Sequence, residues 1–166
     1  GGVNMSVEAS TTFTVMAADT MPDIFSGRRT PDNDGCFLYA RHFNPTVYVL
    51  GNELAAIEGT AAGYCCASGM AAISAVIMQL CNHGDEIVVS NTIYGGSYAF
   101  FNEFLPAKTG VKVTFVPIQD LDAVEAAMTD KTKLLYIETV ANPTLVIADI
   151  PRLAEITHKH GAKLVV

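Results

Sequence analysis

The spacing of apolar residues after Gly63 predicts a regular alternation of strands and helices. Short apolar runs are typical of buried strands, and we predict strands over residues 64–67, 86–90, 111–116, 133–138 and 162–166. Apolar residues that recur every three or four positions predict helices over 68–80, 96–105, 120–128 and 150–160. Strands that alternate with helices indicate βαβ units. We therefore expect an α/β fold with a mostly parallel sheet covered by helices on both faces.

The first sixty residues lack this periodicity. Residues 20–35 are rich in proline, glycine, aspartate and asparagine, which predicts an extended arm or loop, and a short helix is predicted over 52–58. We divide the chain into an N-terminal arm over 1–60 and the first part of a larger α/β domain over 61–166. The last predicted strand ends where a ligand-binding loop is expected, so we expect this sequence to be part of a longer protein.

Composition and charge narrow the possible partners. The 166 residues carry a net charge of −7, which disfavours a nucleic-acid partner, and half of them are hydrophobic, which indicates a buried core. The longest apolar stretch, residues 71–80, is shorter than the ~20 residues of a membrane-spanning helix. The four cysteines form no C-x-x-C pair, so we predict neither a metal site nor disulfides. We expect a soluble, cytoplasmic protein.

Ser68, Gly69 and Met70 lie where a predicted strand passes into a helix. Free backbone N–H groups and the positive end of the helix dipole favour a phosphate at such a point. The alternative is an ordinary serine cap followed by a glycine that allows close packing. Dinucleotide and P-loop fingerprints are absent from the sequence, so another phosphorylated cofactor is the remaining candidate.

Two further groups of residues follow predicted strands. Tyr94 precedes two glycines, which leave room for a planar ligand against its ring, although a tyrosine packed at the sheet edge is the alternative. Glu138, Asn142 and Pro143 supply a carboxylate, an amide and a turn after the fourth strand, and Asn-Pro alone is only a turn signal.

Tyr39 and Arg41 lie in the arm, just before Asn44-Pro45-Thr46. The guanidinium of Arg41 suits the geometry of a phosphate, although an arginine in such a segment is commonly just solvated. The four histidines have no partners that indicate a metal or a catalytic triad.

Taken together and in order, these motifs resemble the Cys/Met-metabolism family of pyridoxal-phosphate-dependent enzymes. Residues 2–6 and 41–46 are most similar to the plant members that cleave methionine. The resemblance implies the N-terminal part of a type I pyridoxal-phosphate-dependent transferase-like fold. It also implies a homo-oligomer in which the N-terminal arm of each chain crosses to the neighbouring subunit. Two chains would form the active sites of a dimer, and two dimers would form a tetramer.

The resemblance also implies how the cofactor, pyridoxal 5'-phosphate, is bound. Ser68 and the backbone N–H groups of Gly69 and Met70 would hold its phosphate. Tyr94 would stack on the pyridine ring and protonate the departing sulfur, and Asn142 would contact the phenolic oxygen.

The remaining implied residues support this site. Tyr39 and Arg41 would reach the phosphate bound by the adjacent subunit, and Glu138 would lie behind the groups that touch the cofactor. The aspartate that pairs with the pyridine nitrogen would follow Val166. The lysine that binds the cofactor covalently would lie further on, since none of the six lysines present is in a matching motif.

The implied reaction is γ-elimination of a sulfur amino acid, L-methionine, to methanethiol, ammonia and 2-oxobutanoate. Synthesis or cleavage of cystathionine and sulfhydrylation of O-acetylhomoserine are alternatives, because the same motifs serve them. An alternative of another class is an inactive, truncated α/β module that serves binding or assembly.

Overall fold

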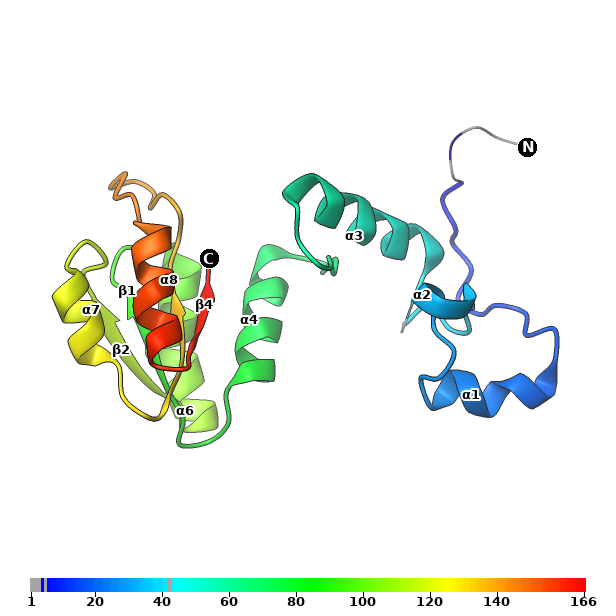
Figure 1. Cartoon of the computed structure of the whole chain (residues 1–166), viewed down its shortest axis with the longest axis horizontal. Helices are drawn as coiled ribbons and strands as arrows, with labels where there is room; N and C mark the ends of the chain where they lie inside the picture. The colour runs from blue at the N-terminus through cyan, green and yellow to red at the C-terminus, as the bar shows by residue number, and fades with distance from the viewer. Residues whose placement is uncertain (1–3, 5, 42) are drawn as a thin grey trace. The chain divides into compact units, whose positions relative to one another are not determined.

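The computed structural model describes residues 4, 6–41 and 43–166. It divides the chain into two compact units, Gly1–Ala67 and Ser68–Val166, here called unit 1 and unit 2 (Figure 1). Four of the residues that carry the resemblance to plant enzymes, Gly2, Val3, Met5 and His42, lie outside the described residues. No helix in the described part of the chain is both long and apolar enough to span a bilayer.

Unit 2 is built on a four-stranded parallel sheet in the order β2-β1-β3-β4. The strands are β1 (Glu86–Ser90), β2 (Lys112–Val116), β3 (Thr132–Tyr136) and β4 (Lys163–Val165). Each lies within a residue or two of its predicted position. The parallel sheet is confirmed, and all the carboxyl ends of its strands lie at one edge.

Helices cover both faces of this sheet, as predicted. The helices of unit 2 are α4 (Gly69–Leu80), α5 (Gly95–Ala99), the π-helical segment η2 (Phe100–Phe104), α6 (Leu105–Thr109), α7 (Leu121–Ala127) and α8 (Ile150–Lys159). Val88 packs with Val124 of α7 and Leu153 of α8. The next residue, Val89, packs with Ile77 of α4 on the opposite face, since successive strand side chains alternate.

Two predictions were wrong, one at the end of unit 1 and one in unit 2. Residues 64–67 form no strand, because a strand needs a hydrogen-bonded neighbour and none of the described strands pairs with this segment. The helix predicted over 96–105 does not end before Pro106. The segment from Gly95 to Thr109 is helical throughout, and Pro106 lies in the first turn of α6, directly after the π-helical turn, where its missing N–H is tolerated.

Unit 1 has more helix than the sequence predicts. Its elements are η1 (Ala18–Thr20), α1 (Met21–Phe25), α2 (Pro31–Asp34) and α3 (Pro45–Glu58). The prediction of an irregular loop over 20–35 was therefore wrong, because Thr30 and Asn33 form a reciprocal capping box that starts α2. Helix α3 starts at Pro45 rather than residue 52, since the Asn44 side chain accepts hydrogen bonds from the first turn. It ends at Glu58, as predicted.

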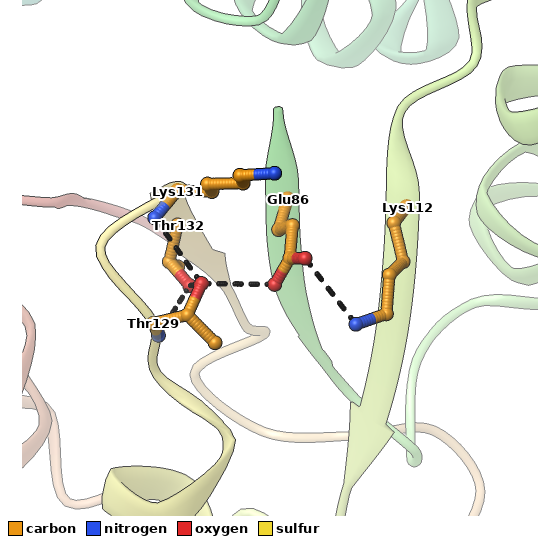
Figure 2. A network of polar contacts seen from close by, with 5 residues as sticks. All are labelled: Glu86, Lys112, Thr129, Lys131 and Thr132. Carbon is orange, nitrogen blue, oxygen red and sulfur yellow. Dashed lines mark hydrogen bonds and ion pairs between the residues drawn. The ribbon is translucent and has the colours of Figure 1, made fainter. Parts of the chain in front are cut away.

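A network of polar contacts lies at the amino ends of strands β1, β2 and β3 (Figure 2). The Glu86 carboxylate accepts a hydrogen bond from the Thr129 hydroxyl at 2.9 Å and lies 3.3 Å from the ammonium of Lys112. These contacts, with the nearby charge of Lys131, lower the pKa of Glu86, and the Thr129 hydrogen bond is the largest cause. This end of the sheet is thus tied by polar contacts, and the predicted site residues lie elsewhere.

Candidate cofactor site

Tyr94 and Glu138 meet at the carboxyl edge of the sheet. They follow the neighbouring strands β1 and β3, which run parallel, so both loops leave the sheet at the same end. The Tyr94 backbone N–H donates a hydrogen bond of 2.8 Å to Oε1 of Glu138. The structure therefore brings together two predicted site residues that are 44 positions apart in sequence.

The side chain of Tyr94 stays open to solvent, with 61% of its surface exposed. Its ring lies on the backbone of Gly96, since a Cβ built on that glycine would come within 2.5 Å of the ring atom Cε1. The exposed aromatic surface is available to a planar ligand.

The start of helix α4 has the predicted cap. The Ser68 hydroxyl oxygen accepts a hydrogen bond of 3.1 Å from the Ala71 N–H. In the described part of the chain, the N–H groups of Gly69 and Met70 have no acceptor, as the first turn of a helix allows. The space beside Gly69 is open, because a Cβ there would meet no atom within 4 Å. The cap alternative and the phosphate prediction are thus compatible at this helix start.

Ser97 connects this helix start to the Tyr94 loop and was missed in the sequence. Its hydroxyl lies 4.0 Å from Sδ of Met70, which places the starts of α4 and α5 next to each other. Burial raises the pKa of the nearby Tyr136 phenol, the Ser97 side chain partly offsets that rise, and the negative charge of Glu138 adds to it. Ser97 lies three residues after Tyr94, and no sequence pattern there predicts that it contacts Met70.

Asn142 lies in the loop that follows Glu138. Two backbone hydrogen bonds close this loop, from Ala141 N to Val146 O at 2.9 Å and from Leu145 N to Ala141 O at 2.8 Å. Ala141 is buried and Asn142 is exposed, so the loop is anchored beside an amide that is free to contact a ligand.

Tyr39 and Arg41 lie in unit 1. Tyr39 forms an antiparallel bridge with Thr12, and the guanidinium carbon of Arg41 lies 5.0 Å from the centroid of the Tyr39 ring. This cation–π contact orients an exposed guanidinium. The structure pairs these two predicted residues with each other, and their contact with a neighbouring subunit stays a prediction.

The parallel sheet with helices on both faces defines an α/β protein, and the free N–H groups at the start of α4 and the exposed tyrosine form a candidate site for a phosphorylated, planar ligand. The family comparison agrees with this class. The model of the family described as "Cys/Met metabolism PLP-dependent enzyme" matches residues 1–166, and the chain belongs to that family.

Its relatives include enzymes that act on sulfur compounds. The chain is 52% identical to methionine gamma-lyase of Arabidopsis thaliana and 39% identical to L-methionine gamma-lyase of Pseudomonas putida. Both matches span the whole chain but only 38% and 40% of the respective relatives. A Campylobacter jejuni protein of the O-acetylhomoserine (thiol)-lyase type, solved with N'-pyridoxyl-lysine-5'-monophosphate, matches with a TM-score of 0.91 and 31% identity over 98% of this chain and 39% of that one.

The residues of unit 2 fit pyridoxal phosphate by their chemistry. A phosphate needs hydrogen-bond donors, and Gly69 and Met70 supply two backbone N–H groups beside open space. A pyridine ring needs an apolar face, and Tyr94 supplies an exposed one. The exposed amide of Asn142 supplies a donor for a ring oxygen.

Proposed function

We propose that the full-length protein is a pyridoxal-phosphate-dependent carbon–sulfur lyase that converts L-methionine to methanethiol, ammonia and 2-oxobutanoate. The observation that carries the proposal is the 52% identity to the Arabidopsis thaliana methionine gamma-lyase across this whole chain. The match includes the stretch that holds Ser68, Gly69, Met70 and Tyr94. The chain spans only about two fifths of its curated relatives, so the proposal concerns the longer protein.

Different residues of this chain bind different parts of pyridoxal phosphate. The N–H groups of Gly69 and Met70 bind the phosphate dianion at the positive end of α4, and Ser68 keeps that helix start in place. Tyr94 covers one face of the ring, and Asn142 donates from its side-chain amide. When bound, pyridoxal phosphate withdraws electrons from the amino-acid carbons and so makes loss of a γ-substituent possible.

Tyr94 is the proposed general acid. Elimination breaks the bond between Cγ and sulfur, and the electron pair leaves with the sulfur. The phenolic Oη gives its proton to the departing methanethiolate, so that methanethiol leaves as a neutral molecule. The exposure of the Tyr94 side chain supports this role, because the hydroxyl is within reach of a ligand.

Tyr39 and Arg41 are proposed to complete the phosphate site of an adjacent subunit. Their cation–π pair presents an exposed guanidinium, which can form two hydrogen bonds to a phosphate. The active protein is then at least a homodimer, because each site takes residues from two chains.

The test is a product assay on the purified full-length protein. With L-methionine alone, methanethiol and 2-oxobutanoate are expected in equal amounts. The C. jejuni relative favours a second candidate, in which sulfide replaces the acetate group of O-acetylhomoserine, so that homocysteine forms and acetate is released. If only that replacement reaction occurs, the lyase proposal is wrong.

A further inference from the structure

We propose that residues 6–13, here called the N-terminal strap, are held by Thr46 and in turn hold the segment from Tyr39 to Arg41 for its contact with a phosphate. Thr46 and the strap act through Arg41, so their role is one of positioning. The inference rests on the proposed function, in which Arg41 binds the phosphate of the cofactor in an adjacent subunit.

The strap pairs with the backbone just before Arg41. Tyr39 forms its antiparallel bridge with Thr12 of the strap. Two backbone hydrogen bonds, each 3.0 Å long, flank this bridge and run from Phe13 N to Leu38 O and from Ala40 N to Thr11 O. The backbone of Tyr39 is therefore held on both sides by a segment that lies far away in sequence.

Thr46 and Asn44 attach the strap to the backbone after Arg41. Thr46 Oγ1 accepts a hydrogen bond of 2.8 Å from the Glu8 N–H, and Asn44 Nδ2 donates one of 2.9 Å to the Glu8 carbonyl. Asn44 is also the N-cap of α3, so a helix of 14 residues carries this attachment. The strap is thus bound to the chain on both sides of Arg41.

The backbone turns back between these two attachments. The Phe43 N–H donates a hydrogen bond of 3.1 Å to the Tyr39 carbonyl, and Arg41 lies within this turn. Because both ends of the turn are hydrogen-bonded to the strap or close to residues that are, the strap restrains where the turn presents Arg41.

The Arg41 side chain is restrained as well, through the Tyr39 ring. The guanidinium carbon lies 5.0 Å from the centroid of that ring, and the face of an aromatic ring attracts a cation. Tyr39 keeps 37% of its surface exposed and lines an apolar cavity of unit 1 with Leu38 and Phe43. An arginine that is already oriented loses less conformational entropy when it binds a phosphate, so the restraint favours binding.

The structural test compares Thr46→Val with Thr46→Ser in the full-length protein. Valine removes the hydroxyl oxygen that accepts the Glu8 N–H, whereas serine keeps it. We expect amide hydrogen exchange over residues 8–13 and 38–41 to be about 3- to 10-fold faster in Thr46→Val, the scale of one lost hydrogen bond, and unchanged in Thr46→Ser. Strand β1 should exchange equally in both. Unchanged exchange in Thr46→Val, or equal acceleration in both variants, would overturn the proposal.

The binding test measures the affinity of the cofactor-free full-length protein for pyridoxal phosphate by absorbance titration. Thr46→Val is expected to weaken binding about 3- to 10-fold. In an Arg41→Ala background the same change should cause no further loss, because the strap acts through Arg41. Losses that add in the double variant would mean a general effect on the fold and would overturn the proposal.

Thr12→Val is the matched control for the binding test. It makes the same exchange at an exposed strap residue that joins Tyr39 through its backbone. The variant should bind pyridoxal phosphate like the parent. A loss equal to that of Thr46→Val would contradict the role assigned to the Thr46 hydroxyl.

The outcomes separate this proposal from the proposed function. If Arg41→Ala weakens binding but Thr46→Val does not, the positioning role is wrong and the phosphate contact stands. If Arg41→Ala binds like the parent, Arg41 contacts no phosphate, and the inference fails together with that part of the proposed function. If the affinities follow the expected pattern but methionine is not cleaved, only the lyase assignment is wrong.

Discussion

Gly51 in helix α3 lies in direct backbone contact with Gly63, because a Cβ on Gly51 would come within 2.5 Å of the Gly63 carbonyl oxygen. The reverse contact is closer still, from a Cβ on Gly63 to the Gly51 carbonyl oxygen. This approach fixes the segment that follows α3 onto the helix within unit 1. Neither glycine has a positive φ, so space rather than backbone conformation requires them.

Gly51→Ala is accordingly expected to destabilise the protein. Alanine normally favours a helix over glycine, but here its methyl group clashes with a backbone carbonyl that has no flexible end to move. Overpacking of this kind costs about 1–3 kcal/mol. The urea midpoint of unfolding should fall for Gly51→Ala. Glu53→Ala, at an exposed position on the same helix, is the control and should leave the midpoint nearly unchanged.

The lowered pKa of Glu86 predicts that the stability of the fold depends on pH. Its pKa is lowered in the folded protein, first by the Thr129 hydrogen bond and also by Lys112 (Figure 2). A carboxyl group whose pKa is lower when folded stabilises the fold above its unfolded pKa, about 4.3, and loses that contribution as pH falls through the folded value. The free energy of unfolding of the parent should thus fall more steeply on acidification than that of Glu86→Gln.

The control for this measurement is Glu103→Gln, on an exposed helical position of unit 2 without a hydrogen-bond or ion-pair partner among the described residues. Its stability profile between about pH 6 and pH 3 should run parallel to that of the parent. A Glu86→Gln profile that also parallels the parent would contradict the role assigned to the network.

The sheet of unit 2 was predictable because its signals are local. Apolar runs such as residues 86–90 are buried on both faces, and helix starts such as Ser68 carry their own caps. The fold class and most boundaries therefore follow from short stretches of sequence. One failure arose where a partner was needed, in residues 64–67, whose strand character depends on a neighbour that the described residues do not provide. The missed starts of α2 and α3 are of another kind, because their caps at Thr30 and Asn44 are local signals that were not used.

The candidate site was predictable in part for the same reason. Tyr94 stands out because it follows strand β1, and the carboxyl edge of a parallel sheet collects such residues. Ser68 stands out as the cap of helix α4, although the strand predicted before it does not form. The bond from Tyr94 to Glu138 spans 44 positions and depends on the order of the strands, which a single sequence does not specify. Ser97 was missed because its role comes from packing against Met70 and Tyr136.

Arg41→Ala is expected to weaken binding of pyridoxal phosphate by the full-length protein. A charged hydrogen bond contributes about 1.5–3 kcal/mol, which corresponds to a loss of about 10- to 100-fold in affinity. Titration of the cofactor-free protein, followed by absorbance, measures the change. Arg28→Ala is the matched control in unit 1, because that guanidinium is engaged by Asp23 at 2.8 Å and 2.5 Å. Equal affinities for Arg41→Ala and the parent would rule out the proposed phosphate contact.

Tyr94→Phe separates stacking from proton donation at the same residue. Phenylalanine keeps the exposed aromatic face but has no proton to give, so cofactor affinity should stay near that of the parent while kcat for γ-elimination falls by about 10²- to 10⁴-fold. Tyr98→Phe is the control on the same helix, because the Tyr98 ring packs on Phe115 with the centroids 4.9 Å apart and its loss of a hydroxyl should leave turnover unchanged. Turnover of Tyr94→Phe within a few-fold of the parent would mean that another group protonates the leaving sulfur. A parallel fall in cofactor affinity would instead assign the hydroxyl to binding.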